Sequence, residues 1–199
     1  CWIKEDDGIY LLKTNSEKGF DRNTQHLEVF SEYYISQIAK LFKKNSVEYD
    51  IVDFKEQLCS KCKLFMNEKQ GYLPIMAFLS EDELRQGEKV LSDRTHFINK
   101  AIEIYGKENY EDLMLFDSIT GNRDRHLGNF GMLVDNQTFE VIKPAPIFDN
   151  GESVLNYYNF SKNLDFGMYA SRTNSLGQRF SDVFKTYIDK RHQKFFEKL

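Results

Sequence analysis

The chain has 199 residues, a formal net charge of -4 at pH 7 and 41% hydrophobic residues, among them 17 Phe and 11 Tyr. This length suffices for one globular domain or two small lobes, and the aromatic content favours a packed core over disorder. The sequence has no basic block, which argues against nucleic-acid binding by this domain, and no apolar run approaches the ~20 residues of a membrane helix.

The first part of the chain reads as strands with one helix. Residues 2–13 are predicted to form a β-hairpin, because apolar runs flank an Asp-Gly turn. From about residue 23 to residue 44, apolar residues recur every three or four positions, as on one face of an α-helix. The segment 47–54 is predicted to be a short strand and the segment 71–79 a buried strand.

The second part reads as mostly helical. Residues 80–118 carry helical spacing, residues 121–151 form a dense polar segment, and a helical tail follows Ser181. We therefore predict an α+β fold with two lobes, a small β-rich lobe at residues 1–79 and a larger helical lobe at residues 80–199.

Cysteine usage and the start of the chain give two weaker expectations. The three cysteines are an odd number, which argues for a reducing compartment. Cys59 and Cys62 form a C-x-x-C pair, but no second pair accompanies it, so two ordinary thiols are expected rather than a zinc or redox site. The chain begins with Cys1 rather than Met, so we expect a fragment of a longer protein.

The polar segment at residues 121–151 contains the candidate catalytic residues. Between Asn122 and Asn129 most residues are polar or Gly, although apolar residues flank them on both sides. Asp124 and Asn129 are five positions apart, which is the spacing of the Asp and Asn in a kinase catalytic loop. A second carboxylate is expected at the end of a strand soon afterwards, and Asp149 fits that position, with Gly151 allowing the backbone to turn.

Two motifs in this segment resemble a known family. Asn-x-Asp-Arg-His-x-x-Asn-Phe at residues 122–130 and Ala-Pro-Ile-Phe-Asp-Asn-Gly at residues 145–151 resemble the signature of HipA-type atypical serine/threonine kinases, and especially their compact CtkA-like bacterial relatives. The Asp-Arg-His-x-x-Asn core is also similar to that of phosphoinositide kinases, which share the wider kinase-like fold. The resemblance implies a bilobal protein kinase-like fold.

The resemblance also implies roles for individual residues. Asp124 would be the catalytic base, and Asn129 and Asp149 would bind Mg²⁺. His126 and Asn122 would brace the loop. Arg125 would contact phosphate or an acidic neighbour. Asp165 begins an Asp-Phe-Gly triplet, the metal motif of ordinary protein kinases, but no apolar strand precedes it, so Asp149 is the preferred ligand.

The nucleotide side of the site needs a cation and a partner carboxylate. Lys13 ends the strand 9–12 and is the candidate for the cation. Glu28 and Glu32 lie one helical turn apart, and periodicity does not separate them. The family's helix pattern, an acidic residue followed by Ala39, selects Glu32.

Adenine is expected against the linker that follows the segment 71–79, near the backbone of Met76 and Phe78. No Gly-rich phosphate loop precedes Lys13, so such a loop would fall before Trp2.

These expectations define an ATP- and Mg²⁺-dependent serine/threonine protein kinase capable of autophosphorylation. The alternatives are a phosphoinositide-like lipid kinase and a nucleotide-binding pseudokinase or toxin–antitoxin module. The expected partners are a protein substrate bearing Ser or Thr and an antitoxin or host protein. The resemblance is compatible with a cytoplasmic bacterial protein and with a secreted effector, and the residues do not separate the two.

Overall fold

The computed structural model describes residues 1–15, 27–84, 94–153 and 166–193. The chain forms two compact units, each assembled from several segments. The first unit contains Cys1–Phe65, Thr120–Asp124 and Pro146–Tyr169, and the second contains Met66–Ile119, Arg125–Ala145 and Ala170–Leu199. The predicted α+β class is confirmed, with strands and helices present in both units.

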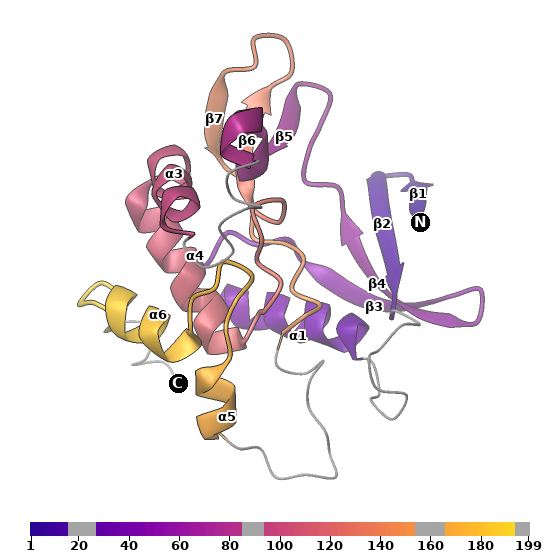
Figure 1. Cartoon of the computed structure of the whole chain (residues 1–199). Coiled ribbons are helices and arrows are strands. Elements are labelled where there is room, and N and C mark those ends of the chain that lie inside the picture. The colour runs from indigo at the N-terminus through magenta and orange to yellow at the C-terminus, as the bar shows by residue number, and fades with distance from the viewer. Residues whose placement is uncertain (16–26, 85–93, 154–165, 194–199) are drawn as a thin grey trace. The chain divides into compact units, whose positions relative to one another are not determined.

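The first unit is built on an antiparallel sheet with the strand order β1-β2-β4-β3 (Figure 1). Its strands are β1 (Trp2–Glu5), β2 (Gly8–Thr14), β3 (Tyr49–Phe54) and β4 (Gln57–Lys63). The predicted hairpin at residues 2–13 is confirmed, since Glu5 pairs with Gly8 across a two-residue turn. The predicted strand at 47–54 corresponds to β3.

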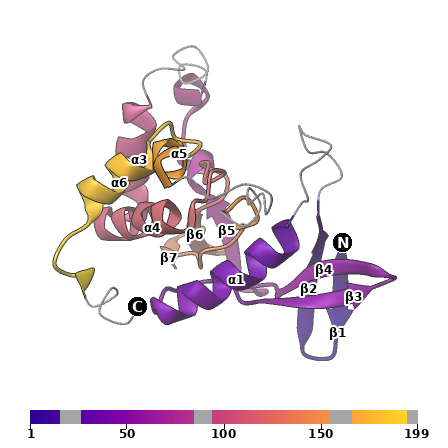
Figure 2. The ribbon, with the colours of Figure 1, turned by 90° about the horizontal axis from the view of Figure 1, so that it is seen from below.

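Helix α1 (Glu28–Leu41) packs against the sheet, mainly on β3 and β4 (Figure 2). Its apolar positions explain this placement, because Val29, Ile35 and Ala39 lie on one face and are buried. Glu32 is also on the buried side of the helix, although it carries a carboxylate. A charge in such a place requires partners, which are described below.

A later segment of the chain joins the first unit. Ile147 forms a parallel bridge with Ser46, and the Val47 amide donates to the Ile147 carbonyl at 2.8 Å. Phe148 packs against the buried cluster of Val47, Tyr49 and Cys62. These contacts anchor the residues immediately before Asp149.

The second unit contains a sheet with the order β5-β6-β7 and most of the helices. Its elements are β5 (Gln70–Pro74), the 3-10 helix η1 (Ile75–Phe78), α3 (Thr95–Tyr105), α4 (Lys107–Thr120), β6 (Gly131–Asp135), β7 (Val141–Pro144) and α6 (Phe180–Tyr187). The short helix α5 (Phe166–Ser171) crosses from the first unit to the second. Phe130 lies in the core of the second unit, with its ring against the rings of Tyr105 and Tyr110.

The units divide the chain differently from the predicted boundary at residues 79 and 80. The first switch between them lies between Phe65 and Met66, because β5 pairs with β6 and not with the sheet of the first unit. The expected strand at 71–79 ends at Pro74 and continues as η1. Gly131 permits the close approach of β5, since a Cβ there would lie 2.1 Å from the Leu73 carbonyl oxygen.

A buried ion pair ties helix α4 to the loop that follows it. The Arg125 guanidinium donates to both carboxylate oxygens of Asp117, from Nε at 2.9 Å and from Nη2 at 3.1 Å. A third donor, Nη1, bonds the Asn129 carbonyl at 2.8 Å. Both side chains of the pair are fully buried. The planar guanidinium suits this two-pronged contact, so Arg125 has an acidic neighbour, one of its two expected contacts.

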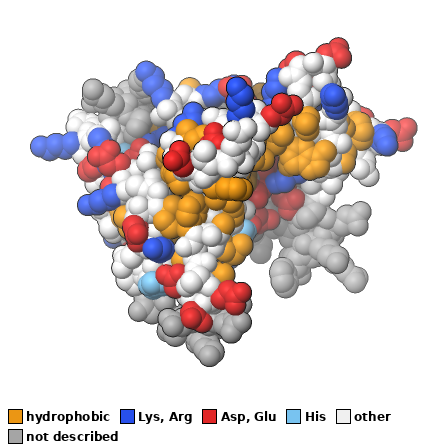
Figure 3. All heavy atoms as spheres, turned by 90° about the horizontal axis from the view of Figure 1, so that it is seen from above, with side chains coloured by type: hydrophobic (Ala, Val, Ile, Leu, Met, Phe, Trp, Pro, Cys, Tyr) orange, Lys and Arg blue, Asp and Glu red, His pale blue; other side chains and the backbone are white. Residues whose placement is uncertain are grey.

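The surface carries charges of both signs. On the face shown in Figure 3, orange side chains form contiguous areas, and blue and red side chains are dispersed around them. Exposed apolar side chains of the second unit include Met76, Phe139, Val141 and Ile142. Within the described ranges, no helix has the length and apolarity needed to cross a bilayer.

The Asp117–Arg125 pair yields the first prediction. Asp117→Ala leaves the Arg125 charge buried without its carboxylate, which typically costs about 3–5 kcal/mol in the free energy of unfolding. Urea unfolding measures this change. The control is Glu103→Ala, which breaks the exposed pair with Lys100 and should cost less than about 1 kcal/mol. Equal effects of the two variants would contradict the assigned role of the buried pair.

Candidate functional site

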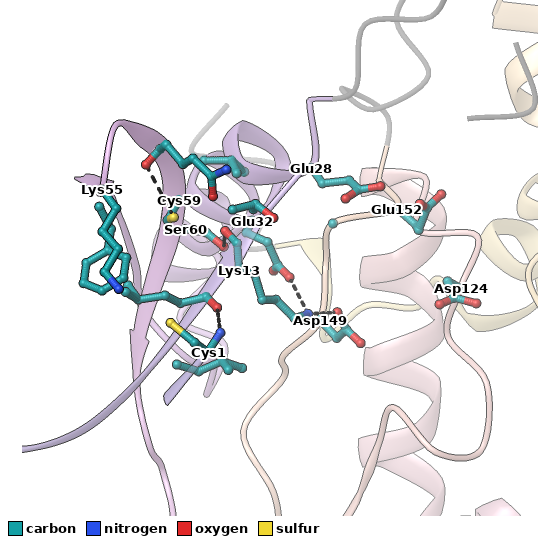
Figure 4. Close-up of a pocket in the computed structure, with 17 residues that line it drawn as sticks. Cys1, Lys13, Glu28, Glu32, Lys55, Cys59, Ser60, Asp124, Asp149 and Glu152 are labelled. Carbon is teal, nitrogen blue, oxygen red and sulfur yellow. Dashed lines mark hydrogen bonds and ion pairs between the residues drawn. The ribbon is translucent and has the colours of Figure 1, made fainter. Parts of the chain in front are cut away.

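A pocket of about 610 Å³ lies within the first unit (Figure 4). Its walls come from β2, α1, the β3–β4 hairpin and the segments around Asp124 and Asp149. The volume falls within the range of small-molecule sites. The lining residues include Lys13 and four of the acidic residues that Figure 4 labels: Glu28, Glu32, Asp124 and Asp149.

Lys13 and Lys55 both line the pocket, and Lys13 is the one that contacts its carboxylates. Its Nζ lies 2.5 Å from Asp149 Oδ1 and 3.4 Å from Glu32 Oε1. Burial works against the charge on Lys13, but Asp149 and Glu32 outweigh it and hold the pKa of Lys13 above its ordinary value. The side chain nevertheless remains 40% exposed, so an anion entering the pocket can reach it.

Glu32 bonds two partners at once. Oε1 accepts from Lys13, and Oε2 accepts the Asn150 amide at 2.8 Å. The side chain is only 2% exposed. Burial raises the pKa of Glu32 to about 7, against the opposing effect of the Lys13 charge. The structure therefore pairs Lys13 with Glu32 rather than with Glu28, in line with the helix pattern.

Asp149 enters the pocket from the segment anchored by Ile147 and Phe148. Its backbone has φ 58°, in the left-handed region, whereas Gly151 does not have a positive φ. The sharp turn thus occurs at Asp149 itself and not at the glycine that the sequence suggested. In Figure 4 its carboxylate points toward Lys13, and the side chain is 32% exposed.

Asp124 lines the same pocket from a different part of the chain. The Asp124 amide donates to Asn122 Oδ1 at 3.0 Å, a short turn in which the side chain of Asn122 supports the backbone. The Arg123 amide donates to the Glu152 carbonyl at 3.1 Å. These bonds join the loop at 122–124 to the segment that follows Asp149. The predicted base and one predicted metal ligand therefore line a single pocket.

The remaining predicted loop residues belong to the second unit. Asn129 is buried, and its amide donates to the His126 carbonyl at 2.9 Å. The His126 ring accepts the Gly128 amide through Nδ1 at 3.0 Å, so this histidine braces the loop around it. The proposed ligands Asn129 and Asp149 are thus assigned to different units, and their joint action on a metal ion remains a prediction.

The expected adenine contacts remain a prediction. Met76 and Phe78 are in η1 of the second unit and are not among the residues that line the pocket. The Met76 amide already donates to the Leu127 carbonyl at 3.0 Å, and the Met76 carbonyl accepts from Leu79. The chain passes from the first unit to the second after Phe65.

The two central cysteines show no paired chemistry. Cys59 and Cys62 are free and buried on β4, and their three-residue separation directs the side chains to opposite faces of the strand. Burial raises the pKa of Cys62 to about 11, which makes it a poor nucleophile. Among the residues that the structure describes, no group of three His, Cys, Asp or Glu side chains has a metal-binding arrangement. Asp165 lies outside the described residues.

Sequence reasoning missed Tyr49 and Asn150. Tyr49 is a buried strand residue whose hydroxyl lies 3.3 Å from the Asp149 amide. The backbone amide and carbonyl of Asn150 form hydrogen bonds with the side chains of Glu32 and Ser31 on α1. An alternating strand pattern does not distinguish such a tyrosine from an ordinary core residue. Its role depends on a contact across 100 residues of sequence.

The ionisation of Glu32 yields the second prediction. Its pKa is about 7 in the folded chain, above the ordinary value of 4.5. The stability due to the protonated carboxyl is therefore fully present below about pH 4.5 and is lost as the pH rises to about 7. Glu32→Gln cannot ionise, so the free energy of unfolding of the wild type relative to this variant should fall across that window. Urea titrations at several pH values measure the difference, and a constant difference would contradict it.

Comparisons with known proteins place the fold. No protein-family model matches the sequence, and no curated protein matches it significantly. Among solved structures, the chain is similar to the crystal structure of CtkA, a Helicobacter pylori proinflammatory kinase, with a TM-score of 0.63 and 19% sequence identity. The match covers 79% of this chain and 55% of that one, so the chain spans little more than half the length of the kinase structure. The chain therefore has a kinase-like fold, as its motifs implied.

Proposed function

We propose that this chain is an ATP- and Mg²⁺-dependent phosphotransferase, a HipA/CtkA-like serine/threonine protein kinase capable of autophosphorylation. The observation that carries the proposal is the pocket in which Lys13 contacts both Glu32 and Asp149, and which Asp124 also lines. A cation, a carboxylate that holds it and two further carboxylates are the parts that phosphoryl transfer requires.

Lys13 would bind the phosphates of the nucleotide. An ammonium group is a compact charge with three donors, suited to phosphate oxygens. Glu32 would keep Lys13 in place while the nucleotide enters, since its second oxygen is fixed by the Asn150 amide. The incoming phosphates would take over part of the contact that Lys13 now makes with Asp149.

The donor set fits magnesium. Mg²⁺ is usually held by one or two carboxylates together with phosphate oxygens and water, rather than by a complete cage of protein ligands. Asp149 offers a partly exposed carboxylate in the pocket, and Asn129 would add its amide oxygen. The ion would neutralise charge on the phosphates during transfer.

Asp124 would act as the base. A Ser or Thr hydroxyl of the substrate would attack the γ-phosphorus, its proton would pass to the Asp124 carboxylate, and ADP would leave with the electrons of the broken P–O bond. The Asn122 bond to the Asp124 backbone supports the loop from which this carboxylate projects. Most of the acceleration would come from positioning and charge stabilisation.

A second candidate is a nucleotide-binding module without turnover. The same pocket, with Lys13 between Asp149 and Glu32, would bind the phosphates of a nucleotide whether or not transfer follows. Measurement of turnover, as described next, distinguishes this candidate from a kinase.

The third prediction concerns Asp124. Asp124→Ala should lower phosphoryl transfer from labelled ATP to the chain itself or to a generic protein by roughly 100- to 10,000-fold, the usual contribution of a general base. Nucleotide binding, followed with a fluorescent ATP analogue, should be retained. Equal labelling of the wild type and the variant would reject Asp124 as the base, and binding without labelling of the wild type would favour the module.

The fourth prediction concerns the metal. Asp149→Ala should abolish the Mg²⁺ dependence of nucleotide binding, because it removes the pocket carboxylate that is the proposed Mg²⁺ ligand. Asp165→Ala is the matched control and should leave that dependence unchanged. Titration of Mg²⁺ at a fixed nucleotide concentration measures both variants, and the reverse pattern would assign the ligand role to Asp165.

A further inference from the structure

The peptide groups on either side of Asp149 are held by side chains. The Asp149 amide donates to the Tyr49 hydroxyl at 3.3 Å, and the Asp149 carbonyl accepts from Asn122 Nδ2 at 3.3 Å. Tyr49 comes from β3 and Asn122 from the loop after α4. Side chains from two segments far apart in the sequence therefore form hydrogen bonds with the backbone of Asp149.

The next residue is held in the same way by helix α1. The Asn150 amide donates to Glu32 Oε2 at 2.8 Å, and the Asn150 carbonyl accepts from the Ser31 hydroxyl at 2.9 Å. All four polar main-chain groups of the Asp149–Asn150 dipeptide thus bond a side chain, and the Asn150 carbonyl also accepts the Ser153 amide at 3.3 Å. This arrangement fixes the dipeptide without placing it in a helix or a strand.

The conformation of Asp149 explains why such support is needed. Its φ of 58° lies in the left-handed region, which disfavours side chains other than glycine. A residue in such a sparsely populated region persists only where the surrounding structure enforces its conformation. In return the turn directs the carboxylate of Asp149 toward Lys13 (Figure 4).

Tyr49 is a firm anchor for this purpose. It is 4% exposed, packs with Val47 and Cys62 in the buried cluster of the first unit, and is held in register opposite Cys62. Its own amide bonds the Ser36 hydroxyl of α1 at 3.4 Å. Phe148, the neighbour of Asp149, packs against the same cluster. The Tyr49 ring and the segment that contains Asp149 are therefore anchored in the same buried cluster.

We propose that Tyr49 is a positioning residue, whose hydroxyl holds the Asp149 peptide in the left-handed conformation and thereby aims the Asp149 carboxylate into the pocket. The consequence for metal and nucleotide rests on the proposed function, whereas the hold on the peptide does not. Tyr49 does not touch the reacting atoms in this scheme. Its influence passes through the backbone of Asp149.

The test is Tyr49→Phe, which keeps the ring and removes only the hydroxyl. Its matched control is Tyr10→Phe, which removes a hydroxyl hydrogen bond of the same sheet, to Asp7 at 2.8 Å on the surface. Two quantities are compared: hydrogen exchange at the Asp149 amide, resolved by NMR, and the Mg²⁺ concentration that half-saturates nucleotide binding. Losing one hydrogen bond of ordinary strength changes an equilibrium by about tenfold.

We expect Tyr49→Phe to speed exchange at the Asp149 amide about tenfold and to raise the half-saturating Mg²⁺ concentration by a similar factor. The KM for the protein acceptor should not change, and Tyr10→Phe should change none of these quantities. Faster exchange with no nucleotide binding even in the wild type would support the hold on the peptide and reject the proposed function. Unchanged exchange in Tyr49→Phe would overturn the proposal.

If Tyr49→Phe does not fold, a measurement on the wild type alone tests the proposal. In the wild type, the Asp149 amide should exchange far more slowly than the exposed turn amide of Asp6. Equal exchange at these two amides would show that Tyr49 does not hold the peptide, and would also overturn the proposal.

Discussion

The buried carboxylate of Glu32 is the constraint on which the first unit depends. A buried carboxylate is tolerated only when hydrogen-bond donors surround it. One oxygen of Glu32 accepts from Lys13, and the other accepts from the Asn150 amide. These two partners come from a strand and from a late loop of the chain, whereas Glu32 itself lies on a helix. Satisfying one carboxylate therefore requires that β2, α1 and the segment after Ile147 meet at the same place. That meeting point is the wall of the pocket.

A site assembled in this way has its charges in position before a ligand arrives. Phosphoryl transfer needs little covalent assistance from the protein and depends on placed charges, so preorganisation is where the fold can contribute most. This preorganisation requires two features that are unfavourable by themselves: the buried carboxylate of Glu32 and the left-handed backbone of Asp149. Both are offset by hydrogen bonds within the first unit, and both lie beside Lys13.

The loop from Thr120 to Asn129 belongs to both units. Its first part, up to Asp124, is bonded into the first unit through Asn122, and its second part is held by Arg125 against Asp117 of α4. The buried guanidinium thus supports the backbone of a predicted metal ligand, while Asn122 supports that of another.

The sequence by itself determined the α+β class, the first hairpin, the central helix and the polar segment that contains Asp124, because these follow from local periodicity, turn chemistry and motif spacing. It also offered both Glu28 and Glu32 without separating them by spacing. Only the tertiary structure decided that β5 pairs with β6 in the second unit and that the Met76 amide donates to the Leu127 carbonyl. The same holds for the hydrogen bond between the Asp149 amide and the Tyr49 hydroxyl. Each of these depends on hydrogen bonds between segments distant in the chain, and a local pattern contains no information about which distant donor meets which acceptor.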